Sequence, residues 1–129
     1  MDVRHDTLLS VSKMIVAINE AALVTPGGLA SVAVINSTPQ SINTLASRVQ
    51  FSIDIRGRSD AILAELENKV TNACEAIANG SGVKIEKWDK FWTSPQVIFD
   101  ETMVRMVRES AKDSGFSFRE IQSGAGHDS

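Results

Sequence analysis

A strict alternation of apolar and polar residues at positions 48–56, RVQFSIDIR, most constrains how this 129-residue chain can fold. Successive side chains of a β-strand point to opposite faces, so a period of two places each set on its own face. The apolar set is Val49, Phe51, Ile53 and Ile55, and the polar set is Gln50, Ser52, Asp54 and Arg56. This pattern predicts a half-buried strand whose polar face ends in an arginine.

Two longer segments, at about 7–23 and 60–79, show helical periodicity instead. In both, apolar residues recur at spacings of three and four, which is the stripe of an amphipathic helix. Asp6 is the expected N-cap of the first helix, and Ser59 or Asp60 that of the second. Short polar side chains suit this position because they accept hydrogen bonds from the first free backbone N–H groups.

The remaining elements complete an α+β pattern. Residues 29–37, rich in β-branched side chains, predict a strand antiparallel to the one at 48–56. Further strands are expected at 82–92 and 116–122, with a third helix at about 101–114 whose Met and Val residues should be core. The order nearly makes the split β-α-β-β-α-β unit, with the opening strand missing. We therefore expect a ferredoxin-like antiparallel sheet with two helices on one face, followed by a helix and a strand.

Composition argues against several classes of protein. The net charge is −3, no basic run stands out and aromatic residues are few, unlike a nucleic-acid-binding surface. No apolar run approaches the roughly 20 residues of a membrane-spanning helix. We see no signal peptide and expect a cytoplasmic protein. The single Cys74 cannot form an internal disulfide and is expected to be buried and inert.

Asn43 and Arg56 are candidates for binding a carboxylate. A guanidinium is planar and can donate two parallel hydrogen bonds to the two oxygens of one carboxylate. The turn that carries Asn43 would add a second polar group if it lay near the edge that carries Arg56. The alternative is a turn asparagine and an arginine on a solvated sheet face, and spacing alone favours that alternative.

His127 lies in the glycine-rich end of the chain, next to Asp128. An imidazole there could serve as a metal ligand, a proton donor or a polarising group, whereas spacing alone favours a flexible tail. The chain has no His pair at i, i+4, no Cys-x-x-Cys and no G-x-S-x-G. The sequence therefore gives no support for a zinc site or a serine nucleophile built by this chain alone.

Three segments together resemble one known family. MDVRHDTLL, SINTLASRVQFSIDIRG and IQSGAGHDS are similar, in this order, to segments of zinc-dependent amidohydrolases of the hydantoinase/carbamoylase type. That family includes N-carbamoyl-L-amino acid hydrolase, β-ureidopropionase and allantoate amidohydrolase. The GAGHD ending favours this branch over the peptidases of the larger superfamily.

The resemblance implies a catalytic α/β domain with a smaller inserted dimerisation domain. Residues 1–99 would be the dimerisation domain, and residues 100–129 the returning piece of the catalytic domain. Asn43 and Arg56 would bind the substrate carboxylate in the active site of the partner subunit, and His127 would line the substrate site of its own subunit. The complete homodimer would hydrolyse a carbon–nitrogen bond of a small N-carbamoyl or ureido acid.

The resemblance also implies that the zinc ligands and the catalytic glutamate lie outside this chain. We therefore expect a piece of a longer enzyme that is inactive alone, holds no zinc of its own and supplies substrate-binding but no catalytic residues. Ala46 and Ser47 depart from the family's Pro-Gly, and Gly57 stands where a histidine is common. The alternative function is a stand-alone ferredoxin-like module for oligomerisation or small-molecule binding, without catalysis.

Overall fold

The computed structural model describes residues 4–124. The chain divides into two compact units, one ending at Thr93 and one beginning at Ser94, and each is described by itself. The first unit contains α1 (Thr7–Leu23), β1 (Gly28–Thr38), β2 (Arg48–Gly57) and α2 (Asp60–Ser81), and the second contains α3 (Glu101–Asp113). The expected α+β class is confirmed, as are the two strands and three helices at these places.

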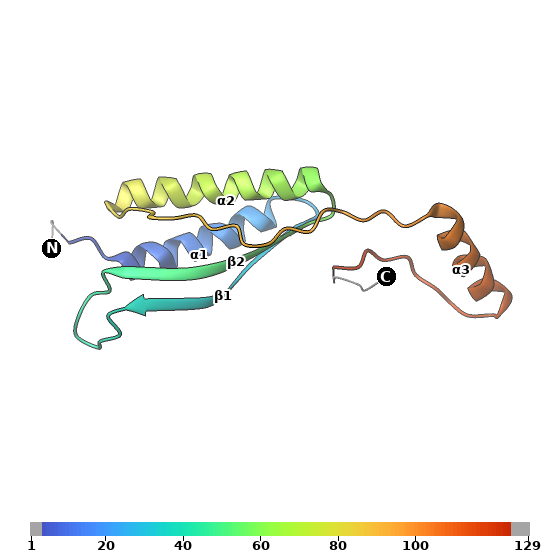
Figure 1. Cartoon of the computed structure of the whole chain (residues 1–129), viewed down its shortest axis with the longest axis horizontal. Coiled ribbons are helices and arrows are strands. Elements are labelled where there is room, and N and C mark those ends of the chain that lie inside the picture. Colours follow the sequence, from blue (N-terminus) through green and yellow to red (C-terminus); the bar gives the residue numbers. More distant parts are fainter. Residues whose placement is uncertain (1–3, 125–129) are drawn as a thin grey trace. The chain divides into compact units, whose positions relative to one another are not determined.

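The first unit is a two-layer structure in which α1 and α2 lie on one face of the β1–β2 hairpin (Figure 1). The strands pair antiparallel, with Leu29 opposite Arg56 at one end and Thr38 opposite Arg48 at the other. Between these ends the register shifts near Val34, whose N–H donates to the Ser52 hydroxyl at 3.2 Å. A side chain thus satisfies a backbone group that the irregular ladder leaves without a strand partner.

The core lies between the two helices and the inner face of the hairpin. Its buried residues come from both helices: Val11, Met14, Ile18 and Ala21 of α1, and Leu66, Val70, Cys74 and Ala78 of α2. The apolar set of β2 packs against this cluster, as the alternation predicts. Burial raises the pKa of the Cys74 thiol to about 11, which makes it inert at neutral pH.

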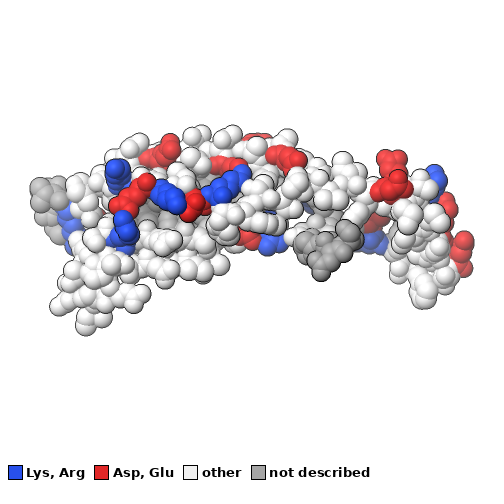
Figure 2. All heavy atoms as spheres, viewed as in Figure 1, with Lys and Arg blue, Asp and Glu red and all other residues white. Residues whose placement is uncertain are grey.

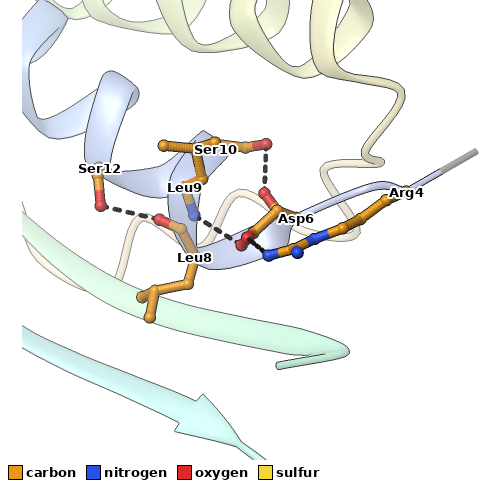
Figure 3. Close-up of polar contacts among 6 residues, drawn as sticks. All are labelled: Arg4, Asp6, Leu8, Leu9, Ser10 and Ser12. Atoms are coloured by element: carbon orange, nitrogen blue, oxygen red, sulfur yellow. Dashed lines mark hydrogen bonds and ion pairs between the residues drawn. The ribbon is translucent and has the colours of Figure 1, made fainter. Parts of the chain in front are cut away.

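The start of α1 follows the predicted capping pattern (Figure 3). The Asp6 carboxylate accepts a hydrogen bond from the Leu9 N–H at 3.0 Å, and Arg4 donates to its second oxygen at 2.8 Å. The Leu9 N–H, followed by Arg4, holds the pKa of Asp6 below its usual value. The Ser10 hydroxyl donates to the Asp6 carbonyl and that of Ser12 to the Leu8 carbonyl. Asp6 therefore caps the start of the helix, because its carboxylate accepts a hydrogen bond from a backbone N–H that has no partner within the helix.

The predicted N-cap of α2 also holds and α3 is capped in the same way, whereas the end of α2 differs from the prediction. Ser59 accepts from the Ile62 N–H at 3.2 Å, and Asp100 accepts from the Met103 N–H at 3.0 Å. The second helix continues past the predicted stop at Asn79 to Ser81, and the glycine that adopts the left-handed C-cap conformation is Gly82, with φ of 67°, and not Gly80. Among residues 4–124, no helix combines the length and hydropathy that a membrane crossing requires.

Two predicted strands are absent from the described residues. Segments 82–92 and 116–122 carry no strand, although Val83 and Ile85 do pack against the core of the first unit. Strand propensity produces a strand only where a neighbouring backbone supplies the ladder, and within residues 4–124 the sheet consists of β1 and β2. The sequence pattern thus identified the two side chains of 82–92 that pack against the core, Val83 and Ile85, but not a hydrogen-bonding partner for the segment.

The prediction that the apolar stripe of α3 is core is wrong for the described structure. No residue of α3 is buried, and Met103, Met106 and Val107 are more than half exposed. A helix of 13 residues with short flanking segments has too little surrounding chain to cover such a stripe. The second unit therefore presents an apolar helix face.

We predict that Leu66→Ala lowers the free energy of unfolding by about 2–5 kcal/mol, because Leu66 is fully enclosed and its removal leaves a cavity. The same change at Leu23, which is 77% exposed, should cost less than about 0.5 kcal/mol. Urea denaturation followed by circular dichroism measures both. Equal effects at the two positions would contradict the described core.

Candidate substrate-binding site

Arg56 lies near the end of β2, on the face of the hairpin that points away from the helices. Its side chain is 57% exposed, while the flanking Ile55 packs against the core. The strand ends tightly against α2, since a Cβ on Gly57 would lie 2.5 Å from the backbone nitrogen of Leu63. The glycine that follows Arg56 is therefore required by the close approach of two backbones.

Arg56 forms an ion pair with Asp54, two residues earlier on the same polar face. The guanidinium donates from Nε to both Asp54 oxygens, at 3.1 and 3.3 Å, and from Nη2 to one of them at 2.7 Å. The hydrogen bond from Arg56 holds the pKa of Asp54 below its usual value, and Asp54 in turn raises the pKa of Arg56. A lowered carboxyl pKa means that the pair is lost only as pH falls below the ordinary Asp range, so it is intact at neutral pH.

A shallow hollow of about 300 Å³ surrounds this pair, lined by Leu29, Ala30, Ser31, Asp54 and Arg56. Its residues come from the paired ends of both strands, because Leu29 lies directly opposite Arg56 in the ladder. One cation, one anion and an apolar wall thus meet at one end of the sheet. Such a surface can bind a small carboxylate with an apolar group beside it.

Asn43 lies in the turn that joins the two strands, which is at the opposite end of the hairpin from Arg56. The turn lies beyond the Thr38–Arg48 pair, and eight residue steps along β2 lead from Arg48 to Arg56, or roughly 26 Å at strand spacing. The Asn43 side-chain oxygen accepts from the hydroxyl of Ser41 at 2.8 Å. The expectation that strand pairing brings Asn43 close to Arg56 in one chain is therefore wrong, because an antiparallel hairpin separates its turn from its open end.

Of the two histidines, the structure describes His5 only. His127 lies outside the described residues. His5 has its Nδ1 3.1 Å from the Ser81 carbonyl oxygen, a contact that joins the start of the chain to the end of α2. Within residues 4–124, no group of three or more His, Cys, Asp or Glu side chains is arranged to hold a metal ion.

Exposed ion pairs are common elsewhere in the first unit. Positive and negative side chains are interspersed over the face shown in Figure 2. Arg48 pairs with Glu86, Lys69 with Glu65 and Lys90 with Glu67, all with at least one largely exposed partner. Isolated surface pairs of this kind contribute about 0–1 kcal/mol to stability. An ion pair alone therefore does not mark a site, and the Arg56 pair differs in lining a hollow.

A larger hollow, of about 460 Å³, lies on the second unit. It is lined by α3 and its flanking segments, mainly through Phe99, Met103, Val104, Val107 and Phe118. Three of its charged groups are engaged within the unit, since Asp100 caps α3 and Arg108 pairs with Glu120. This hollow is the exposed apolar face of α3, and its polar groups show no convergence on a ligand.

Comparison with known proteins places this geometry in context. No protein-family model matches the chain. The chain is 32% identical, over 133 residues, to N-carbamoyl-L-amino-acid amidohydrolase of Rhizobium meliloti, and 33% identical, over 94 residues, to allantoate amidohydrolase of Bacillus subtilis. Its fold matches the crystal structure of a hydantoinase/carbamoylase family amidase from Burkholderia multivorans with a TM-score of 0.91 and 34% identity. This chain belongs to the hydantoinase/carbamoylase family.

The match covers nearly all of this chain but only part of each relative. It takes in 99% of the chain and 31% of the Rhizobium meliloti protein, 73% and 23% for the Bacillus subtilis protein, and 99% and 31% for the Burkholderia multivorans structure. The chain thus spans about a third of the length of a hydantoinase/carbamoylase family protein. The assignment of residues 1–99 to a dimerisation domain and 100–129 to a catalytic domain stays a prediction.

We predict that this hydantoinase/carbamoylase chain, expressed alone, holds no tightly bound zinc. The described residues offer no ligand cluster, and the only cysteine is buried with a raised pKa. Elemental analysis after chelator washing, zinc reconstitution and desalting should give far less than one zinc per chain. A value near one would show that residues such as His127 and Asp128 complete a site.

Sequence reasoning overlooked Asp54 as a site residue. The alternation at 48–56 already places Asp54 and Arg56 on one face two positions apart, which is the distance at which strand neighbours on a face can form an ion pair. That signal was present, but only the arginine was interpreted. In this family member the pair, rather than Arg56 alone, forms the charged part of the hollow.

Proposed function

We propose that this chain is part of an amidohydrolase that cleaves a carbon–nitrogen bond of a small N-carbamoyl or ureido acid, and that Arg56 binds the carboxylate of that substrate. The observation that carries the proposal is the exposed Arg56 in a small, partly apolar hollow at the end of β2. It is supported by relatives named for hydrolysis of N-carbamoyl-L-amino acids and of allantoate.

Arg56 contributes to such a reaction by orienting the substrate. Two parallel hydrogen bonds from a guanidinium fix both the position and the plane of a carboxylate. The rest of a small substrate then has little freedom, so its carbonyl is presented to the attacking water in one geometry. Hydrolysis forms a bond from the water oxygen to the carbonyl carbon and breaks the C–N bond, and the departing amine takes up a proton.

Asn43 cannot assist Arg56 of its own chain, because roughly 26 Å of strand separates the two ends of the hairpin. A small carboxylate contacts both residues only if they come from different chains. We therefore propose that, in a homodimer, Arg56 of one chain and Asn43 of the partner subunit bind one carboxylate. This modifies the expectation that one chain supplies both residues to a single site. His127 remains a proposed substrate residue outside the described structure.

The chemistry of the family implies a metal ion, expected to be zinc. The described residues do not fit this role, since no cluster of ligands occurs within 4–124. We propose that the ligands, together with the general base, belong to the part of the enzyme that this chain does not span. The described residues then bind and orient the substrate, and a chain lacking the other parts has no activity.

The test is hydrolysis by the complete protein encoded around this sequence. We expect the protein to release free amino acid from N-carbamoyl-L-amino acids and to lose this activity when a chelator removes the metal. The substrate analogue with a carboxamide in place of the carboxylate should have a much lower kcat/KM, because it lacks the negative charge that Arg56 would bind. A folded complete protein that hydrolyses neither N-carbamoyl nor ureido acids would overturn the proposal. A reading frame closed on both sides of this sequence would favour the stand-alone module instead, because the first unit has a core of its own.

A further inference from the structure

The turn between β1 and β2, residues 39–47, contains hydroxyl groups that contact the side chain of Asn43. We propose that Ser41 is a positioning residue, whose hydroxyl holds the Asn43 amide with its oxygen toward the turn and its NH2 group toward the substrate carboxylate. This inference rests on the proposed function, in which Asn43 contributes to the active site of the other chain of a homodimer, and it assigns a further residue to that site.

The side-chain oxygen of Asn43 lies within hydrogen-bonding distance of two hydroxyl groups. Ser41 donates to this oxygen at 2.8 Å, and Thr44 donates to it at 3.4 Å. The two hydroxyl oxygens are 3.3 Å apart. Hydrogen bonds between a hydroxyl and an oxygen acceptor are most often about 2.7–2.8 Å long. Ser41 therefore provides the main contact to the amide, and Thr44 a weaker one.

The chemistry of the two partners decides which way the amide must face. A carboxylate only accepts hydrogen bonds, so Asn43 can bind it only through its NH2 group. The amide oxygen then faces away from the carboxylate and needs a donor of its own. The Ser41 hydroxyl supplies this donor. In the reverse orientation the amide oxygen would face the carboxylate, and the two would repel each other.

Asn43 needs such a contact because it lies on an exposed part of the turn. Residues 41–45 are all exposed, so packing does little to limit the rotation of its amide. The base of the turn is closed, since the Ser47 N–H donates to the Thr38 carbonyl at 2.8 Å. The backbone is thus held, and the Ser41 hydroxyl fixes the side chain before substrate arrives. Freedom lost in advance is not lost on binding, so we expect Ser41 to strengthen substrate binding.

The experiment is a double-mutant cycle in the complete protein, with an N-carbamoyl-L-amino acid as substrate. Ser41→Ala should raise KM about three- to tenfold with kcat nearly unchanged, because it removes the shorter hydrogen bond to the amide oxygen. Ser41→Thr keeps the hydroxyl and should keep KM close to that of the wild type. In an Asn43→Ala background, Ser41→Ala should change neither parameter further.

Ser47→Ala is the matched control for this cycle. It removes another exposed hydroxyl of the same turn, which donates to the Thr38 carbonyl and not to Asn43. We expect KM to be unchanged in this variant. An equal rise of KM in Ser41→Ala and Ser47→Ala would show that both distort the turn, and the inference would fail.

The remaining outcomes separate this inference from the proposed function. If Asn43→Ala raises KM but Ser41→Ala does not, Ser41 is not a positioning residue and the role of Asn43 stands. If Ser41→Ala acts equally with and without Asn43, its effect is structural and the inference fails. If Asn43→Ala has no effect, the proposed role of Asn43 fails, and this inference with it. If Arg56→Ala alone has no effect, the role of Arg56 fails, while the expected pattern for Ser41 and Asn43 would still support this inference.

Discussion

Replacing Arg56 by alanine in the complete protein should lower kcat/KM for an N-carbamoyl-L-amino acid by about 30- to 1,000-fold, or ~2–4 kcal/mol. The loss is large because one charge-assisted bidentate contact both binds the substrate and orients its carbonyl. The fold should be unaffected, since Arg56 lies on the outer face of the hairpin and its truncation opens no cavity in the core. Steady-state kinetics and thermal melting of the same preparation measure the two effects separately.

Arg48→Ala provides the matched control for this prediction. Arg48 is at the other end of β2, is similarly exposed and also pairs with a carboxylate, that of Glu86. Its removal changes charge and surface in the same way, without touching the hollow around Arg56. An equal loss of kcat/KM in both variants would mean that the loss comes from removing a positive charge anywhere on the strand, and not from a contact between Arg56 and the substrate. A large fall in melting temperature for Arg56→Ala alone would instead make it a structural residue.

Mixing two variants, each impaired in one of the two carboxylate-binding residues, should restore activity if each site draws on two chains. In a dimer of one Arg56→Ala chain and one Asn43→Ala chain, one site carries both defects and the other carries neither. Because a C₂ dimer has two equivalent sites, activity should recover to about half of wild type per mixed dimer. This expectation follows from the hairpin, which places Asn43 and Arg56 at opposite ends of one chain.

The alternative predicts a different result. If Asn43 and Arg56 of the same chain served one site, each site of the mixed dimer would carry one defect and nothing would recover. Subunit exchange must be verified first, for example with two differently tagged chains purified in sequence on both tags, since unmixed dimers would imitate that result. Verified mixed dimers without recovery would refute the two-chain site while leaving the effect of Arg56→Ala intact.

Much of the first unit could be predicted because its elements are locally encoded. The alternation at 48–56 fixed which face of β2 packs on the core and which carries Asp54 and Arg56. Asp6 and Ser59 marked the helix starts, since an N-cap depends on a side chain and a backbone N–H only three residues apart. The resemblance to the hydantoinase/carbamoylase family, carried by three short segments, was confirmed over nearly the whole chain.

The parts that could not be predicted depend on contacts between distant residues. The strand character of 82–92 and 116–122 needs a pairing partner, and none lies within the described residues. The separation of Asn43 from Arg56 follows from the hairpin register, which cannot be read from the number of residues between them along the chain. The stripe of α3 has the pattern of a core helix, yet burial depends on what surrounds it. Asp54 was visible in the pattern, but its ion pair with Arg56 became apparent only from the distance between the two side chains.

A crystal structure of the complete protein with a bound, slowly hydrolysed N-carbamoyl-L-amino acid analogue tests the central claim most directly. We expect the ligand carboxylate within about 2.7–3.0 Å of the Arg56 guanidinium, in the hollow beside Asp54 and Leu29, with Asn43 contributed by the partner subunit. A ligand bound with its carboxylate away from Arg56 of either chain would contradict the account.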